Sequence, residues 1–410
     1  MIRRLAVLVF ALLFAAACGQ SSQDNAIVLG AIYPLSGPQA AGGRSELAGV
    51  EAALRVAHTN VRLQVINVTT PEAATAAVDS LIDRYHVPAI VGTYGSTLSA
   101  AASSRAEERK TVYWETGAVA DPITAQRHYV FRTVATGSSL GRMAVTFTHD
   151  VLLPRFNVAA PRAVIVRVND VYGRSVGGGE EDLARTMEIS VVDVIEYSPH
   201  AFDAGVIATR IANDRPDFLW DVSYLDDGVA LWRAIVKAGI ALKGAIGTSS
   251  AFCMPAFGQM LGRDAIGVYA ADKPDADVSP AALSVQGQAL LAEAKAAYGS
   301  VPMDIPAVAG FVGGWTLFHD VLPQVRGALT PESIRTAALN VNVPVGDSIN
   351  GGGVEFAGAG ALDEGQNTRA AAVVGQWQAV GVMKVVYPPA YATNWVDSRD
   401  YGRISLPSTG

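Results

Sequence analysis

Short polar residues that could bind or attack a small molecule follow several apolar runs in this chain. The stretch GTYGST, residues 92–97, comes directly after the apolar run 88–91 and offers hydroxyls, a phenol and free backbone N–H groups. Such a stretch can cradle a phosphate, carry a nucleophile or hold a small ligand by neutral hydrogen bonds. It lacks the lysine of a G-x-x-x-x-G-K-[ST] loop, so we expect no nucleotide hydrolysis.

A second stretch, GTSSA at 247–251, nearly matches the G-x-S-x-G turn that presents a nucleophilic serine in hydrolases. Its last residue is alanine, and the only histidine after residue 200 is His319, inside a predicted helix. A serine hydrolase acting through Ser249 is therefore an alternative that we do not favour, because the triad lacks a base. The histidines show no H-x-x-H or H-E-x-x-H spacing. We expect no enzyme, no metal site and no cofactor.

Composition limits the class of protein. The chain has 410 residues, of which 50% are hydrophobic and only 17% charged, so it can bury more than one core and two lobes are expected. The net charge of −7 comes with no basic block. Nucleic acid is therefore not an expected partner, because phosphate binding depends on clustered lysine and arginine.

The N-terminus predicts export. Arg3 and Arg4 precede an apolar stretch, 5–17, that is too short to span a bilayer comfortably, which indicates a secretory signal at 1–18. Residues 15–19, AAACG, resemble the bacterial lipobox, which implies that Cys18 is lipidated; cleavage after Ala17 is the alternative. We expect a periplasmic or extracytoplasmic protein held at the membrane by a lipid anchor. Cys253 would then have no disulfide partner and would pack in the core.

Strands and helices alternate in two series, which is typical of parallel strands with helical crossovers. We expect first-series strands at 27–33, 61–68, 89–93 and 112–116, with helices at 46–58 and 71–85. Second-series strands are expected at 163–168, 189–197, 217–223 and 245–247, with helices at 179–187, 204–213 and 228–238. Three helices, at 280–298, 305–325 and 331–340, and a hairpin at 370–378 and 382–387 follow.

Two such series predict an α/β protein with two doubly wound parallel-sheet lobes. A closed barrel is the competing arrangement, but the long polar segment 133–161 interrupts an even ring of strands. The helix at 305–325 contains glycines, a histidine and an aspartate, so we expect a buried core helix rather than a membrane span.

Ligands of open parallel sheets bind at the carboxyl ends of the strands. The residues that follow the predicted strands include Tyr94, Ser96, Thr97, Ala118, Val119, Tyr172, Tyr224 and Ser249. Such uncharged donors and aromatic rings suit a small organic ligand held in a dehydrated cleft. Helices that begin just after Ser96 and Ser249 would add positive dipole ends, which favour an anionic group. Each residue could also be an ordinary turn or cap residue, so their convergence carries the argument.

Six segments together resemble the leucine/isoleucine/valine-binding family of extracytoplasmic solute-binding proteins of ABC transporters, which has the type I periplasmic binding fold. They are IVLGAIYPLSGPQA, VPAIVGTYGST, TGAVADPIT, FRTVATGSSLGRMA, AVIVRVNDVYGRSV and PDFLWDVSYLDDGVALWRAIVKAGI. The resemblance implies two lobes joined by a three-segment hinge. Lobe 1 would comprise 25–142 and 272–344, and lobe 2 would comprise 143–271 and 345–410.

The resemblance also assigns roles to the residues at the strand ends. Ser96, with Thr97 beside it, matches the group that holds the ligand carboxylate, while Ala118 and Val119 match a carbonyl and a threonine, so one hydroxyl is missing. Tyr172 and Tyr224 match aromatics of the second lobe. The acid that pairs with the ligand ammonium falls at Ser249, with Asp221 as a possible substitute.

The resemblance implies a binding protein that captures a small solute between its lobes and delivers it to an inner-membrane ABC permease. Because position 249 lacks a carboxylate, we expect a carboxylate, aromatic acid, amide or lipophilic compound rather than a standard branched-chain amino acid. A sensor module of the same fold, which passes ligand occupancy to a kinase or channel, is the alternative.

Overall fold

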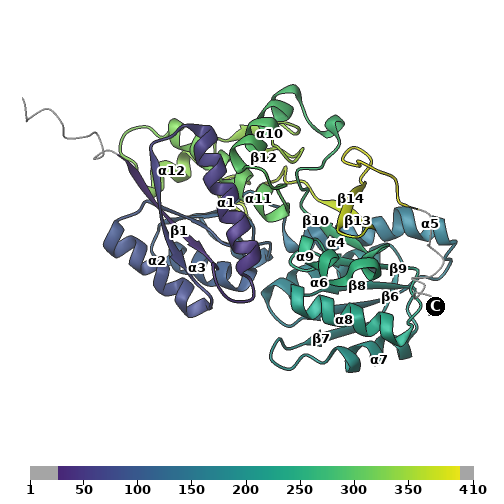
Figure 1. Cartoon of the computed structure of the whole chain (residues 1–410). Helices are drawn as coiled ribbons and strands as arrows, with labels where there is room; N and C mark the ends of the chain where they lie inside the picture. The colour runs from purple at the N-terminus through teal and green to yellow at the C-terminus, as the bar shows by residue number, and fades with distance from the viewer. Residues whose placement is uncertain (1–25, 398–410) are drawn as a thin grey trace, which may run out of the picture.

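The computed structural model describes residues 26–397, which form two lobes side by side (Figure 1). Lobe 1, at the left of Figure 1, has a five-stranded sheet in the order β2-β1-β3-β4-β5, with every strand pair parallel. Its strands are Ile27–Tyr33 (β1), Val61–Asn67 (β2), Ala89–Gly92 (β3), Val112–Glu115 (β4) and Val130–Arg132 (β5). The signal segment 1–18 and the expected lipid site Cys18 lie outside the described residues.

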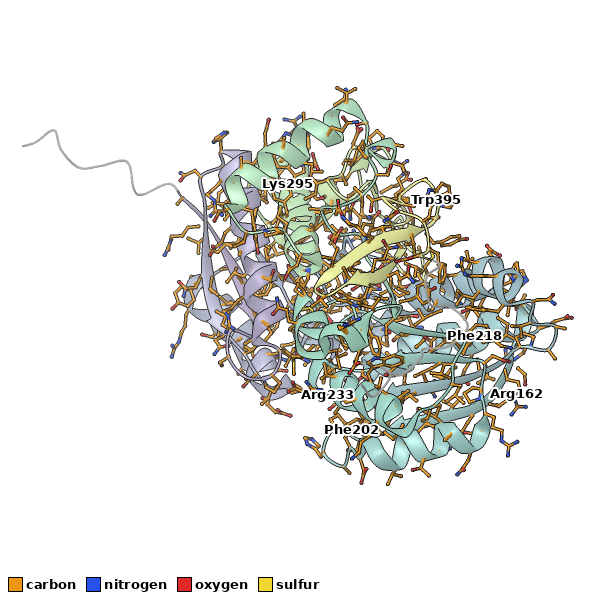
Figure 2. The ribbon with its side chains drawn as sticks, turned by 45° about the vertical axis from the view of Figure 1, so that its right-hand side comes forward. Arg162, Phe202, Phe218, Arg233, Lys295 and Trp395 are labelled. Carbon is orange, nitrogen blue, oxygen red and sulfur yellow. The ribbon has the colours of Figure 1, made fainter. Side chains whose placement is uncertain are left out.

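Lobe 2 has a seven-stranded sheet in the order β14-β13-β10-β9-β8-β6-β7. Its strands are Arg162–Val168 (β6), Ser190–Tyr197 (β7), Phe218–Val222 (β8), Gly244–Thr248 (β9), Tyr269–Asp272 (β10), Val373–Ala379 (β13) and Val382–Tyr387 (β14). Strands β6 to β10 pair in parallel, and the β13–β14 hairpin, yellow in Figures 1 and 2, adds to β10 antiparallel. Every residue of β8 and β9 is buried, because helices cover both faces of the sheet.

Local sequence signals explain where the helices begin and end. Thr70 caps α2 by accepting a hydrogen bond from the N–H of Ala73, and Pro71 occupies the first turn, where no N–H is required. Gly239 ends α8 in the left-handed conformation that glycine adopts without strain. The helices are Ala40–Ala57 (α1), Pro71–Tyr85 (α2), Ser96–Glu108 (α3), Gly137–Phe147 (α4), Leu153–Phe156 (α5), Val171–Thr186 (α6), Ala204–Asp214 (α7), Leu225–Ala238 (α8), Pro255–Leu261 (α9), Val285–Tyr298 (α10), Ile305–Trp315 (α11) and Pro331–Ala338 (α12).

Helices α1 and α11 pack closely across lobe 1. A Cβ added to Gly49 would lie 2.0 Å from the carbonyl oxygen of Ala307, and one added to Gly310 would lie 2.0 Å from that of Glu46. Only glycine permits this approach of two backbones. The continuous helical segment Ile305–Gln324 is apolar enough to cross a membrane by length and composition, but 78% of its most apolar window is buried. It is a core helix, as expected.

The chain passes between the lobes three times among the described residues. It crosses after β5, after β10 and before β13, because strands on either side of these points belong to different sheets. Helix α4, which contains the expected boundary at 142, packs on α6 and β10 of lobe 2. The segment 345–369, expected in lobe 2, instead stays in lobe 1, where Phe356 packs on Trp114.

Several elements differ from the sequence expectations. Strands β5 and β10, of three and four residues, were not expected. The segment 133–161, expected to be a polar connection, contains α4. Although the segment is polar, Leu140, Ala144 and Phe147 lie on one side of α4 and are fully buried.

Candidate functional site

A cavity of about 430 Å³ lies between the lobes, at the carboxyl ends of strands from both sheets. Its volume is in the range of pockets that bind small organic molecules, roughly 300–1,000 Å³. Lobe 1 lines it with Pro34, Ser36, Pro38, Gln39, Ala41, Gly42, Thr69, Pro71, Tyr94, Thr97 and Leu98. Lobe 2 lines it with Asp170, Pro199, His200, Tyr224, Leu225, Asp226, Asp227, Ser250 and Met254.

Three of the predicted site residues, Tyr94, Thr97 and Tyr224, are in the wall of this cavity. Thr97, in the first turn of α3, donates a hydrogen bond of 3.2 Å to Oδ2 of Asp170 across the cleft. Tyr224, which precedes α8, donates to the same oxygen at 2.7 Å. The two rims of the cleft therefore meet at one carboxylate.

Asp170 was in a predicted loop but was not among the expected ligand-binding residues. Its Oδ1 accepts hydrogen bonds of 2.9 Å from the backbone N–H groups of Tyr172 and Gly173, which caps α6. With Oδ2 occupied by Thr97 and Tyr224, the carboxylate accepts four hydrogen bonds. Because all four hydrogen bonds come from the protein, the Asp170 carboxylate holds these protein groups in place and is not a free counter-ion for a charged ligand.

Ser96, Ala118 and Val119 lie behind the cavity wall and are almost fully buried. The Ser96 hydroxyl oxygen accepts from the N–H groups of Val119 and Ala120, at 3.3 and 3.1 Å. Glu115 accepts from the N–H of Ala118 at 2.7 Å, and so fixes the same loop. Ser96, which was expected to hold a ligand carboxylate, here uses its hydroxyl oxygen as an acceptor for the loop after β4.

Tyr172 also lies behind the wall. Its hydroxyl donates to the carbonyl oxygen of Thr248 at 2.8 Å, and its ring lies 5.5 Å from that of Tyr224. The side chain is 1% exposed. In this structure Tyr172 supports Tyr224 from within lobe 2.

Ser249 lines a small chamber between the lobes rather than the main cavity. Tyr94, Ser250 and Met254 line both spaces, and the Tyr94 hydroxyl contacts the Met254 sulfur at 3.7 Å. The chamber has a volume of about 10 Å³, which is room for about one water molecule. We call it the floor chamber of the cleft.

Lys273, a buried residue that lines the floor chamber, was also missed by the sequence predictions. It follows β10 where the chain crosses to lobe 1, and its ammonium lies 3.0 Å from Oδ1 of Asp272, 3.3 Å from Oγ of Ser249 and 3.4 Å from the carbonyl oxygen of Gly117. Burial by itself lowers the pKa of Lys273, but the negative charge of Asp272 overcomes this effect and the net shift is upward. The ammonium therefore stays charged.

Two glutamates near the floor chamber have shifted pKa values. Burial raises the pKa of Glu46 well above its ordinary value, and the charge of Glu115 adds to the shift. Burial also raises the pKa of Glu115 to about 7, although backbone N–H groups oppose it. Glu46 Oε1 accepts from the Thr116 hydroxyl at 2.6 Å, while no hydrogen bond reaches its Oε2. Burial beside a second acid therefore favours the neutral form of Glu46.

The prediction that a helix N-terminus follows Ser249 and adds a positive dipole end is wrong. No helix begins just after Ser249; α9 begins only at Pro255, after a turn in which Ser249 and Ser250 have positive φ values of 31° and 24°. Asp221, considered as a substitute acid, is buried in β8 and does not line the cavity. Its pKa is raised to about 7 by burial.

The hydrolase alternative gains no support from the geometry. The residues that line the floor chamber, within the described part of the chain, include no histidine. Lys273 lies near Ser249 but is a charged donor, so it cannot accept the hydroxyl proton as a base. Within residues 26–397 no group of three or more His, Cys, Asp or Glu side chains is placed to hold a metal ion. Cys253 is a free, buried thiol.

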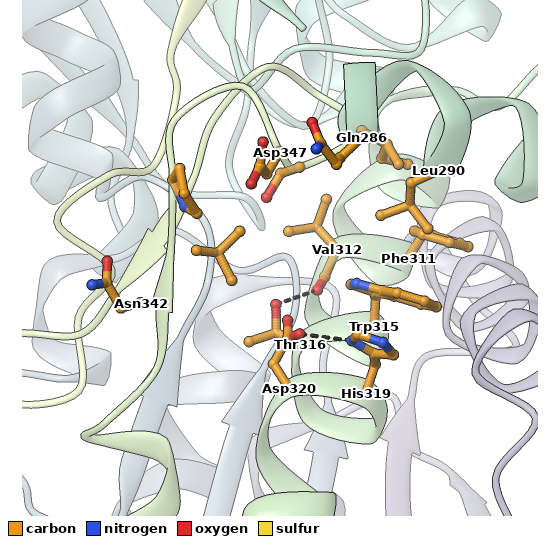
Figure 3. A pocket seen from close by; sticks show the side chains of 14 residues that line it. Gln286, Leu290, Phe311, Val312, Trp315, Thr316, His319, Asp320, Asn342 and Asp347 are labelled. Atoms are coloured by element: carbon orange, nitrogen blue, oxygen red, sulfur yellow. Dashed lines mark hydrogen bonds and ion pairs between the residues drawn. The ribbon is translucent and has the colours of Figure 1, made fainter. Parts of the chain in front are cut away.

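A second cavity, of about 280 Å³, lies within lobe 1 between α10, α11 and the segment 342–349 (Figure 3). Trp315 stacks on His319 at 4.1 Å, and His319 contacts Asp320 at 2.7 Å. All of its lining residues belong to lobe 1, so a molecule there would not join the two lobes. The interlobe cavity is therefore the better candidate for the functional site.

Comparisons with known proteins agree with this geometry. A family model described as periplasmic binding protein matches residues 26–380. "Leu/Ile/Val-binding protein homolog 8" of Brucella abortus (strain 2308) is 28% identical over 375 residues, covering 88% of this chain and 90% of the relative. A leucine-binding protein from Thermotoga maritima superposes with a TM-score of 0.73 at 18% identity, over 88% of this chain and 97% of that one. An ABC transporter solute-binding protein from R. palustris, solved with benzoate, also gives 0.73 at 18% identity, over 90% and 98%.

The expected fold class is confirmed, because two doubly wound lobes recur over nearly the full length of these solved structures. The chain belongs to the periplasmic binding protein family, whose model matches residues 26–380.

Proposed function

We propose that this protein is the ligand-binding component of an ABC import system, which captures a small organic solute between its lobes and delivers it to a membrane permease. The observation that carries the proposal is the interlobe cavity, whose walls come from the strand ends of both sheets. A solute in that position contacts both lobes, so it binds the closed form better than the open form. Closure is then the signal that a permease reads.

The solute we propose is small and is not a standard branched-chain amino acid. Position 249 has a serine where the family resemblance places an acid, and a buried ammonium without a counter-ion is costly. The relative from R. palustris with bound benzoate supports an acid without an amino group as one candidate class. Amides and lipophilic molecules are the other candidates.

We propose that Tyr94, Thr97 and Tyr224 contact the solute directly. Ser96, Ala118, Val119, Tyr172 and Ser249 would then shape the rims from behind or become accessible when the lobes open. No catalytic step is part of the proposal, since the group to which the chain belongs consists of binding proteins.

We also propose that the mature protein is extracytoplasmic and anchored through lipid on Cys18. The support comes from the family and from the signal pattern of the first residues. Labelling of growing cells with a radioactive fatty acid tests this point. Incorporation into the natural chain and loss of it in Cys18→Ala is the expected result.

The test of solute capture is a thermal-shift screen of carboxylates, aromatic acids, amides, amino acids and lipids against residues 26–397. A solute at 100 times its dissociation constant adds about 2.7 kcal/mol to the free energy of unfolding. Small-angle scattering should then show whether that solute compacts the protein. Thr97→Val should weaken the binding, whereas Thr209→Val, on the exposed face of α7, should not.

If no solute from any class shifts the melting temperature or the scattering profile, capture between the lobes is refuted. If a solute binds and is chemically converted, the serine hydrolase alternative replaces the proposed binding function.

A further inference from the structure

The cavity within lobe 1 has a wall of stacked aromatic rings. Phe311, Trp315 and His319 follow one another at four-residue spacing along the helical segment Ile305–Gln324, so they lie on one side of it (Figure 3). The ring centres of Phe311 and Trp315 are 6.1 Å apart, with their planes 7° apart. Those of Trp315 and His319 are 4.1 Å apart at 15°. A flat ring or a positively charged group can pack against such a wall.

Two polar groups in the lining have no hydrogen-bond partner within residues 26–397. Ser348 is 7% exposed, and its hydroxyl makes no hydrogen bond to this part of the chain. Oδ2 of Asp320 is also buried without a partner, while its Oδ1 contacts Nδ1 of His319 at 2.7 Å. Buried polar groups are normally satisfied. A hydroxyl and a carboxyl oxygen left open in the lining of one cavity therefore indicate an occupant that donates hydrogen bonds.

The carboxyl groups of the cavity favour a positively charged donor. Asp320 and Asp347 both line it, and Oδ1 of Asp347 accepts from the Ser284 hydroxyl at 2.6 Å. No lysine or arginine is among the described residues that line the cavity. An ammonium group has three protons to donate, so it supplies the donors that Asp320 and Ser348 lack. Its charge also favours the ionised form of Asp320, as an opposite charge does for any nearby carboxyl.

A small molecule can reach this cavity without passing between the lobes. A wider hollow of about 970 Å³ lies beside α12 and shares His319, Asp320, Asn342 and Val343 with the cavity. The two spaces therefore meet at the His319–Asp320 pair. None of the residues that line the lobe 1 cavity lines the interlobe cavity.

We propose that the lobe 1 cavity is a second binding site, which takes a small aromatic molecule that carries an ammonium group. The ring packs beside Trp315, and the ammonium group lies toward Asp320 and Ser348. The volume of about 280 Å³ is close to the lower end of the range for small-molecule pockets, so the ligand has one ring rather than several.

Calorimetry with phenethylammonium chloride tests the ligand class. The purified protein should bind this probe, and it should bind 2-phenylethanol at least about tenfold more weakly, because charge-assisted hydrogen bonds and cation–π contacts are lost with the charge. The two probes have the same ring and chain length, so they differ only in the ammonium and hydroxyl groups. Equal affinities would overturn the inference.

Variants locate the probe. Asp320→Asn keeps the shape of the side chain and should weaken phenethylammonium binding at least about tenfold. Asp83→Asn is the matched control, because Asp83 is an exposed acid of lobe 1 that pairs with Arg109 at 2.6 Å outside the cavity. If Asp320→Asn does not fold, Trp315→Leu removes the stacking ring and should weaken the binding of the same probe. An unchanged affinity in the folded variant contradicts the site.

A crystal structure of the protein with phenethylammonium chloride gives the second measurement. The ring should lie beside Trp315. A probe found only between the lobes, or water alone in the lobe 1 cavity, overturns the inference. These outcomes are independent of solute capture, because the two cavities share no lining residue.

Discussion

The hydroxyl of Thr97 in lobe 1 donates a hydrogen bond of 3.2 Å to the carboxylate of Asp170 in lobe 2. Tyr224 reaches the same oxygen from its own lobe. The rims are therefore joined by neutral donors that converge on one acid. Because that acid also caps α6, the position of the closing contact is tied to the backbone of lobe 2.

Replacement of this acid should affect both stability and closure. Asp170→Ala removes a helix cap, which lowers the free energy of unfolding by about 1 kcal/mol, and it also removes the acceptor of Thr97. Asp203→Ala, at the cap of α7, has only the first effect. Urea unfolding should show a similar loss in both variants, while scattering should show a larger radius of gyration in Asp170→Ala alone. Equal radii would contradict a closing role for Asp170.

Tyr224→Phe keeps the ring and loses the hydroxyl that donates to Asp170 at 2.7 Å. We expect the affinity for the solute found in the screen to fall by about 1 kcal/mol, as calorimetry would measure it. Tyr387→Phe, which removes a hydroxyl bonded to Asp150 at 2.9 Å far from the cavity, is the control. An equal fall in solute affinity in both variants would show that the Tyr224 hydroxyl does not contribute to solute binding.

Ser96→Ala tests the loop behind the cavity wall. The substitution leaves the buried N–H groups of Val119 and Ala120 without their acceptor, which costs about 1–3 kcal/mol of stability. Ser104→Ala, on the same helix but only partly buried, should cost much less. Thermal unfolding distinguishes the two, and a Ser96→Ala variant as stable as Ser104→Ala would contradict this role of the Ser96 hydroxyl.

The stability of the protein should depend on the protonation of Asp221. Burial raises its pKa from 3.8 to about 7, and no hydrogen bond reaches its Oδ2. The folded state therefore keeps a proton that the unfolded state loses, so stability falls as pH rises from about 4 to about 7, by up to about 1.4 kcal/mol per pH unit. Asp221→Asn should flatten this part of the curve. Denaturant unfolding at several pH values in that range measures how the free energy of unfolding depends on pH. The same dependence in the natural protein and in Asp221→Asn would contradict a raised pKa of Asp221.

Two glycines provide a matched test of the core. Gly310→Ala would place its Cβ 2.0 Å from the carbonyl oxygen of Glu46 and should destabilise the protein by about 1–3 kcal/mol or more. Gly178→Ala, in α6, meets nothing within 4 Å and should stabilise it by about 0.5–1 kcal/mol. Melting temperatures that move in opposite directions are the expected result. Two losses of similar size would contradict the close contact of α1 and α11.

Periodicity in the chain predicted most of the sheet framework. The run Ile27–Tyr33 forms β1 with the expected bounds, and the predicted hairpin at 370–387 forms β13 and β14. Because the strand ends were predicted, residues that follow them, such as Tyr94 and Tyr224, could be predicted at the cleft from the sequence.

Tertiary packing decided the rest. The role of Lys273 depends on contacts with Gly117 and Ser249, which are 156 and 24 residues away in the sequence, so no local pattern indicates it. The raised pKa of Glu46 depends on burial beside a second acid, Glu115, which only the folded arrangement creates. Local residue patterns determine elements and their ends, whereas charge, burial and the closeness of distant groups exist only once the lobes have packed.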